Sequence, residues 1–327
     1  MWHRLLHVSL VAILAALTPG ALAQSASAVH GADGMPDPGA VGEIPFRVER
    51  NRTILPLVVS QAETLNILLD TGMTFDGVYL FRKEAQRYFP GEDLDSVRVG
   101  GAGSGDATYA LMADSMTLRF GGVPFDSQLV VISQSDITQA FRSDGVAGSS
   151  LFRSFVVEID NDEALIRLHN PESFVADSSW HAVPITLKKG IPFLEGEVSI
   201  AGEEPIPLVL YIDSAAGEAV VLLVRDTMKF ALPESLEASH LGTGLSGDVH
   251  GSVGRIHMFG FGGFTLHDVP TAFAPAEVRS KQEGADGIIG NDALRRFNLI
   301  FDYTGGVLYL KPGGLFGAPF DVDPTDR

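Results

Sequence analysis

The sequence has 327 residues and no cysteine. Without cysteine the chain forms no disulfide, no thiol nucleophile, no thiolate metal site and no lipid-modified N-terminal cysteine. Basic residues are also scarce, because 23 Lys and Arg stand against 41 Asp and Glu and give a net charge of -18. An acidic surface repels phosphate backbones, so we expect no nucleic-acid partner.

Long apolar runs are missing except near the start of the chain. There Arg4 precedes the apolar run Leu10–Leu17, and Ala21-Leu22-Ala23 forms a small-residue cleavage site. This pattern predicts a signal peptide over residues 1–23, with an N-terminal anchor as the alternative. No later run reaches the length of a membrane span, so we expect none in the mature chain. Together with the missing cysteines, this predicts an exported bacterial protein, either periplasmic or secreted.

Residues 24–43 are rich in Ala, Ser, Gly and Pro, which predicts a flexible linker; a pro-segment is the alternative. Further on, short runs of Val, Ile, Phe and Thr alternate with GG, DG and NP pairs, a pattern typical of strands and turns. Long helical periodicity is absent, and Phe81–Phe89 is the best helix candidate. The sequence therefore predicts a mainly β protein.

Two apolar runs end in a similar triplet, Asp70-Thr71-Gly72 and Asp213-Ser214-Ala215, 143 positions apart (213 − 70). The segment Asp144–Asp160 aligns with Asp286–Asp302 at an offset of 142 (286 − 144). Two shorter motifs also recur in the same order: Ser-Gly-Asp at 104–106 and 246–248, and Phe-Gly-Gly at 120–122 and 261–263. Matching landmarks at nearly one offset indicate two copies of one unit. We predict lobes at 44–175 and 183–315, followed by a tail at 316–327.

The repeat predicts a site with two carboxylates. A buried carboxylate is costly unless something shares its charge, and Asp70 ends an apolar run. Two similar lobes would bring Asp70 and Asp213 together at a pseudo-two-fold axis. Two carboxylates about 3 Å apart share one proton, so one pKa of the pair rises and the other falls. Such a pair can activate a water and protonate a carbonyl oxygen.

The two triplets, with Val146-Ala147-Gly148 and Ile288-Ile289-Gly290, resemble the bilobal pepsin-like aspartic proteases, in a divergent bacterial form. The resemblance implies an all-β fold of two similar lobes with a cleft between them. It implies a monomeric endopeptidase that cleaves peptides or proteins without a cofactor or metal. By position, it implies that Asp70 and Asp213 are catalytic and that Thr71 and Ser214 cross-link the loops, with Gly72 and Ala215 supporting them.

The sequence departs from this family in three places. Ala215 stands where the family usually has glycine, and because alanine adopts a positive φ less readily, the match to the family's loop geometry is weaker in the second lobe. Met73 and Ala216 stand where Ser or Thr is common. With fewer hydrogen-bond donors the carboxylate pKa is depressed less, so we expect activity at milder pH. The expected flap hairpin spans residues 97–118, with Tyr109 in its returning strand rather than at its tip. The predicted tip residues are Gly101, Ala102, Gly103, Ser104 and Gly105.

Other features favour no additional chemistry. The GGAGSG stretch lacks the Lys-Ser/Thr of a phosphate-binding loop. Four histidines fit no metal-ligand spacing, and we expect them to be surface or strand residues: His240, His250, His257 and His267. Two alternatives to the protease stay open. The chain could be a non-catalytic peptide- or protein-binding protein on the same scaffold, or a structural β protein whose aspartates cap turns.

Overall fold

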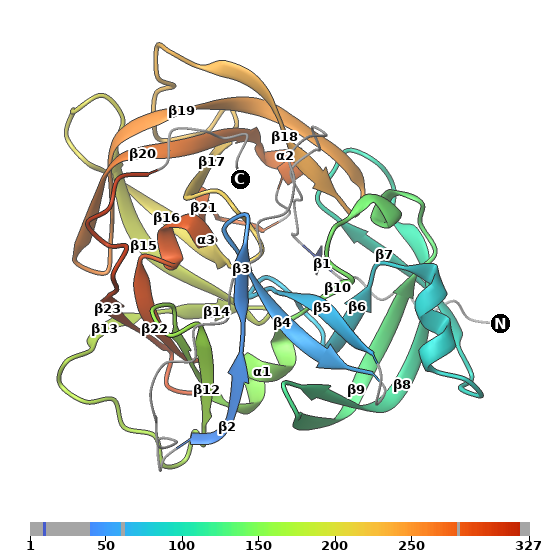
Figure 1. Ribbon diagram of the computed structural model, residues 1–327. Helices are drawn as coiled ribbons and strands as arrows, with labels where there is room; N and C mark the ends of the chain where they lie inside the picture. The colour runs from blue at the N-terminus through green and yellow to red at the C-terminus, as the bar shows by residue number, and fades with distance from the viewer. Residues whose placement is uncertain (1–8, 11–39, 60–62, 280–281, 321–327) are drawn as a thin grey trace, which may run out of the picture.

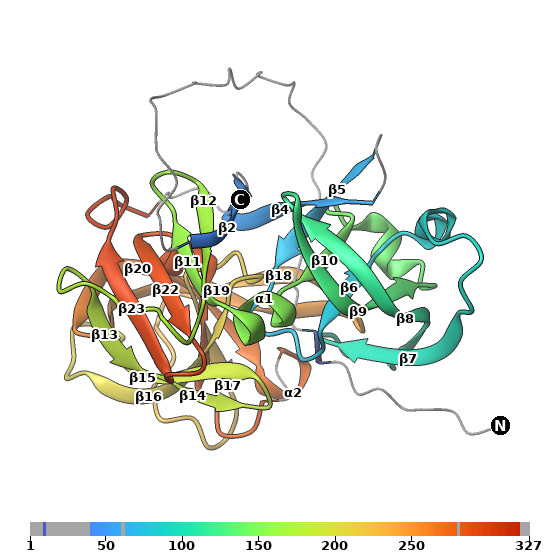
Figure 2. The same ribbon diagram turned by 90° about the horizontal axis from the view of Figure 1, so that it is seen from below.

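The structure, a computed structural model, describes residues 9–10, 40–59, 63–279 and 282–320. The chain is all-β, with two similar lobes and a sheet shared between them (Figure 1). Figure 2 shows β6, β8 and β9 of one lobe on the right and β14, β15 and β16 of the other on the left. No helix within these described ranges is both long enough and apolar enough to cross a membrane.

The first lobe is built on a nine-stranded sheet in the order β1-β7-β8-β9-β6-β10-β5-β4-β3. Its strands are β1 Ser9–Leu10, β3 Arg47–Glu49, β4 Arg52–Val58, β5 Thr64–Leu69, β6 Gly77–Leu80, β7 Asp95–Gly101, β8 Thr108–Phe120, β9 Val123–Ser133 and β10 Gly145–Ala147. The second lobe has an eight-stranded sheet in the order β14-β15-β16-β21-β17-β20-β19-β18. Its strands are β14 Thr186–Lys188, β15 Ile191–Ser199, β16 Ile206–Asp213, β17 Val220–Val224, β18 Glu237–Gly244, β19 Gly247–Phe261, β20 Phe264–Pro275 and β21 Gly287–Gly290.

The shared sheet has six strands in the order β13-β23-β22-β11-β12-β2. These are β2 Ala40–Pro45, β11 Val156–Asp160, β12 Leu165–His169, β13 His181–Pro184, β22 Phe297–Asp302 and β23 Val307–Pro312. The helices are short: 3-10 helices η1 Lys83–Tyr88 and η2 Ile137–Ala140, and α-helices α1 Ser149–Ser154, α2 Ala276–Arg279 and α3 Asn291–Leu294. The predicted helix at 81–89 is therefore present as a shorter 3-10 helix.

The sequence repeat corresponds to a repeat of strand pairing. In the first lobe β10 lies parallel to β5 and antiparallel to β6, while β6 lies parallel to β9. In the second lobe β21 lies parallel to β16 and antiparallel to β17, while β17 lies parallel to β20. Each apolar-apolar-Gly element therefore threads between the strand that leads to an aspartate and the strand that follows it.

The aspartates that open the second repeated motif have a structural role. Asp144 accepts the backbone N–H of Asn66 at 2.8 Å, and Asp286 accepts that of Val209 at 2.9 Å. Asn66 and Val209 lie in β5 and β16, the strands that lead to Asp70 and Asp213. Equivalent carboxylates therefore anchor equivalent strands in the two lobes.

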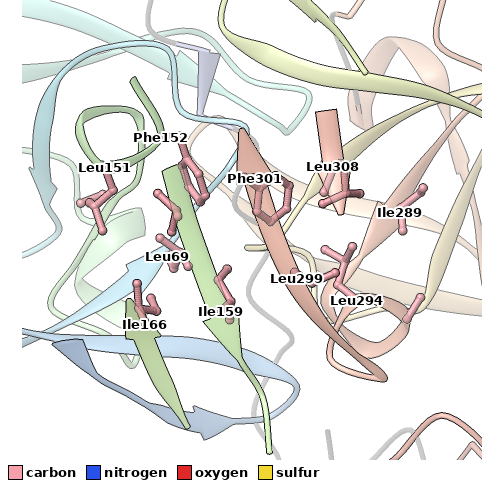
Figure 3. Close-up of a cluster of buried hydrophobic side chains, with 14 of the residues drawn as sticks. Leu69, Leu151, Phe152, Ile159, Ile166, Ile289, Leu294, Leu299, Phe301 and Leu308 are labelled. Carbon is pink, nitrogen blue, oxygen red and sulfur yellow. The ribbon is translucent and has the colours of Figure 1, made fainter. Parts of the chain in front are cut away.

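The main hydrophobic cluster contains buried side chains from both halves of the chain. β11 of the first half pairs with β22 of the second, with Ile159 opposite Leu299. Figure 3 shows Phe152 and Phe301 side by side from the two halves, and their ring centroids are 5.2 Å apart. Leu69 and Ile212, which precede the two aspartates, belong to the same buried cluster, so one close-packed core supports both aspartate loops.

Two predicted boundaries were wrong. The linker over 24–43 extends too far, because residues 40–43 belong to β2, which pairs with β12 and buries Ile44. The tail over 316–327 begins too early, because Phe320 is buried under the Arg296 guanidinium. The signal peptide predicted over 1–23 lies outside the described residues, apart from a two-residue strand, β1, beside β7. The lobe limits and the monomeric state stay predictions.

Candidate active site

The first aspartate lies in a closed backbone loop at the end of β5. Asp70 is fully buried, and its backbone N–H donates to Ala147 in the threading strand β10 at 2.9 Å. Its carboxylate Oδ1 accepts the backbone N–H of Gly72 at 2.6 Å. A side chain on Gly148, just beyond β10, would place its Cβ 1.9 Å from the Asp70 carbonyl oxygen. Glycine is therefore required where the threading strand passes this loop.

The second aspartate repeats this arrangement. Asp213 is the last residue of β16 and is also fully buried. Its Oδ1 accepts the backbone N–H groups of Ala215 at 3.0 Å and Ala216 at 3.1 Å. Ala215 fits this loop without a glycine conformation, because among the described residues no non-glycine residue with positive φ falls in the loop. The Ala215 methyl group instead packs in a cluster with Met73 and Phe75 of the first lobe.

The hydroxyl residues of the two triplets join the loops by reciprocal hydrogen bonds. The backbone N–H of Thr71 donates to Ser214 Oγ at 3.1 Å, and that of Ser214 donates to Thr71 Oγ1 at 3.0 Å. The Thr71 hydroxyl then donates to the Ile212 carbonyl, and the Ser214 hydroxyl to the Leu69 carbonyl, both at 2.9 Å. Each hydrogen bond that one loop makes to the other therefore has an equivalent in the reverse direction. The two aspartate loops therefore face each other across the axis.

The β7–β8 hairpin of the first lobe contacts the opposite lobe at its tip, and its Val99 shares a buried cluster with Ala215 of the second aspartate loop. β7 and β8 pair with Val99 opposite Thr108, so the chain turns between Gly101 and Thr108. The Gly103 N–H donates to the Val278 carbonyl at 3.0 Å, and the Gly105 N–H donates to the Ser246 carbonyl at 2.7 Å. Four of the five predicted tip residues therefore lie at or next to this contact: Gly101, Ala102, Gly103 and Gly105, while Ser104 lies exposed between them.

The tip on the other side comes from a second hairpin, β18–β19, the counterpart of the first. The Ser246 N–H donates to the Ala102 carbonyl at 2.9 Å, and its hydroxyl accepts the Gly101 N–H at 3.2 Å. Leu245 packs into a cluster of the first lobe, while Ala102 packs into one of the second. The repeated Ser-Gly-Asp motif therefore marks two tips that exchange apolar residues. Sequence reasoning described only one of them.

Tyr109 does not take part in this contact. It lies in β8 with 61% of its side chain exposed, and the Arg98 guanidinium stands 5.9 Å from its ring centroid. The returning strand thus carries Tyr109 on the outer face of the hairpin.

Sequence reasoning also missed two residues close to the aspartate loops. Arg52 in β4 is buried and donates its Nε–H to the Ala215 carbonyl at 3.0 Å, so the first lobe supports the second loop. Tyr303 follows β22 and stacks on Phe152 with ring centroids 5.3 Å apart. Burial, with a smaller contribution from the negative charge of Asp70, raises the pKa of Tyr303 well above its usual value, so its phenol stays neutral.

No protein-family model and no curated protein matches the sequence. Among solved structures, the chain is similar to the aspartic proteinase from Irpex lacteus, with a TM-score of 0.51 and 13% sequence identity. The match covers 88% of this chain and 99% of that one. At this identity the similarity shows the fold, a pepsin-like arrangement of two β lobes, and leaves the chemistry to be argued from the residues.

Proposed function

We propose that this chain is an aspartic endopeptidase in which Asp70 and Asp213 form the catalytic pair. The observation that carries the proposal is the reciprocal bonding of Thr71 and Ser214, which fixes two buried aspartate loops against each other. If the two aspartates only capped turns, their loops would not need to bond to each other reciprocally. The alternative of a structural β protein therefore explains the reciprocal bonding less well. The similarity to an aspartic proteinase supports the scaffold.

In the proposed reaction the pair holds one proton and one water. The ionised carboxylate takes a proton from the water as its oxygen attacks the peptide carbonyl carbon. The protonated carboxyl group gives its proton to the carbonyl oxygen, forming a neutral gem-diol. The carboxyl group that took the water's proton then gives a proton to the amide nitrogen, and the other carboxylate takes a proton from a gem-diol hydroxyl. The C–N bond breaks, a carboxylic acid and an amine leave, and the pair again holds one proton. No covalent enzyme intermediate forms, and the backbone N–H groups on Asp70 Oδ1 and Asp213 Oδ1 hold both carboxylates in place.

Substrate entry requires the two hairpin tips to separate, because both aspartates are fully buried with the tips in contact. The backbone groups at the tips bond to one another in this closed arrangement. An extended peptide would bind between the hairpins and the aspartates as an added strand, and its backbone would form hydrogen bonds with these groups. Closure around the peptide would then exclude water other than the reacting one.

We also propose that the protein acts outside the cytoplasm, as a periplasmic or secreted bacterial enzyme. Support comes from the charged start, apolar run and Ala21-Leu22-Ala23 site of the sequence, and from the absence of cysteine. Detection of a mature N-terminus at Gln24 in exported protein would test this. An unprocessed N-terminus in the membrane fraction would favour the anchor instead.

The function is tested by incubating residues 24–327 with an unfolded protein from acid to neutral pH. We expect cleavage that a statine-type transition-state mimic blocks. Asp70→Asn and Asp213→Asn should each lower the rate by at least about 10²–10⁴-fold, because each removes an acid–base group. Exposed Asp126→Asn is the matched control and should leave the rate unchanged. No cleavage of any substrate, with tight peptide binding that neither active-site variant alters, would establish the non-catalytic binding protein.

A further inference from the structure

Three side chains with metal-binding atoms meet on the β18–β19 hairpin: His240, Asp248 and His250. One ligand atom from each lies within 4.8 Å of the other two, and no other such group occurs in the part of the chain that the structure describes. His240 lies opposite His250 in the strand register, and Asp248 precedes His250 by two residues. Alternate residues of a strand share a face, so all three point the same way. Val249 between them is buried, which places the three on the outer face.

The three side chains already contact one another. His240 Nε2 lies 3.2 Å from Asp248 Oδ1, and the two imidazole rings have centroids 5.0 Å apart. The Thr243 hydroxyl donates to Asp248 Oδ1 at 2.6 Å and so orients the carboxylate toward His240. His240 is half-buried, whereas Asp248 and His250 are exposed. His240 and Asp248 are therefore held next to each other, and the exposed His250 side chain can rotate toward an ion that arrives from solvent.

We propose that His240, Asp248 and His250 form a binding site for one divalent transition-metal ion, with zinc as the probe of choice. Imidazole nitrogen and carboxylate oxygen are the ligands that such ions share, and three protein ligands leave coordination positions for water. With bonds of about 2.0–2.1 Å, tetrahedral zinc holds its ligand atoms about 3.4 Å apart. The 3.2 Å between His240 Nε2 and Asp248 Oδ1 already matches this separation, and rotation of the exposed His250 side chain would bring its ring nitrogen to the same range. Thr243 acts as an outer partner that orients the carboxylate.

The site lies on the stem of the hairpin whose tip contacts the first lobe. The register of β18 and β19 shifts between His240 and Gly242, so the stem is irregular next to the proposed ligands. An ion joining the two strands would stiffen the stem close to Leu245 and Ser246. The proposed metal site is independent of the proposed peptidase activity, because none of its ligands touches the aspartate loops.

Zinc binding is measured by calorimetry on residues 24–327 carrying no histidine tag. We expect one zinc ion per chain. His250→Ala and Asp248→Asn should each weaken zinc affinity by more than about tenfold, since loss of even an outer partner costs that much. Zinc should also raise the melting temperature of the wild type by more than that of either variant at the same zinc concentration.

His257→Ala is the matched control. His257 forms a similar ring pair with His267 in the same sheet, with centroids 6.2 Å apart, but belongs to no three-ligand group among the described residues. This variant should bind zinc like the wild type. Melting without metal checks the fold of each variant, and both substituted ligands are exposed. Absence of saturable zinc binding in the wild type, or an equal loss of affinity in His257→Ala, would overturn the proposal.

Discussion

The two hairpins whose tips contact each other, β7–β8 and β18–β19, are alike at their tips and different along their stems. Both carry Ser-Gly-Asp near the turn, and each tip places an apolar residue, Ala102 or Leu245, in the opposite lobe. On the outer faces of the stems, Tyr109 and Arg98 of one hairpin contrast with the His240–Asp248–His250 group of the other. The two copies therefore agree where both lobes meet at the axis and differ where each faces solvent.

The largest expected loss of stability comes from removing the matching hydrogen bonds between the two aspartate loops. Thr71→Val and Ser214→Ala each remove a hydroxyl that accepts one N–H and donates to one carbonyl of the opposite lobe. Each buried group left unpaired costs about 1–3 kcal/mol, so both variants should lose comparable stability in urea unfolding. The control Thr117→Val removes an exposed hydroxyl bonded to Asp126 and should stay within about 0.5 kcal/mol of the wild type. A loss of stability in only one of Thr71→Val and Ser214→Ala would contradict the equivalence of the two loops.

A smaller change is expected from separating the tips. A Cβ on Gly105 would lie 2.7 Å from the Ser246 carbonyl oxygen, whereas one on Gly100 would lie 3.4 Å from the Ala107 Cβ. Neither glycine has a positive φ, so Gly105→Ala and its control Gly100→Ala differ mainly in this contact. We expect faster amide hydrogen exchange at position 105 and at Ser246 in Gly105→Ala alone, with about 1–3 kcal/mol lost to overpacking. Equal exchange in both variants would show that the tip contact does not close the site.

The smallest change is a shift in pH dependence. Asp213 Oδ1 accepts the Ala216 N–H, and a serine hydroxyl at this position adds a donor to the charged carboxylate. A donor to the charged form lowers a carboxyl pKa, so Ala216→Ser should move the acid limb of kcat/KM to lower pH by up to about one unit. In the wild type, which lacks that hydroxyl donor, kcat/KM should be highest above about pH 3. A shift in the opposite direction, or a wild-type optimum below that value, would contradict this explanation.

The features that could be predicted from the sequence are those that occur in both copies of the repeat. The two lobes, the facing triplets and the threading glycines follow from one offset that recurs along the chain. Residues 40–43 were misassigned because their Ala and Gly content predicts a linker, whereas pairing with β12 makes them a strand. The support of Ala215 by Arg52 was missed because it joins residues 163 positions apart without a motif. The histidine group was missed because spacing rules along the chain do not include strand register, which brings His240 opposite His250.

The central claim is that the two lobes hold Asp70 and Asp213 around a single reacting site. A crystal structure of residues 24–327 with a bound statine-type mimic tests it most directly. We predict that the hydroxyl of the mimic, which replaces the attacking water, lies about 2.6–3.2 Å from an oxygen of each carboxylate. A mimic bound away from the aspartates, or in contact with only one of them, would contradict the claim.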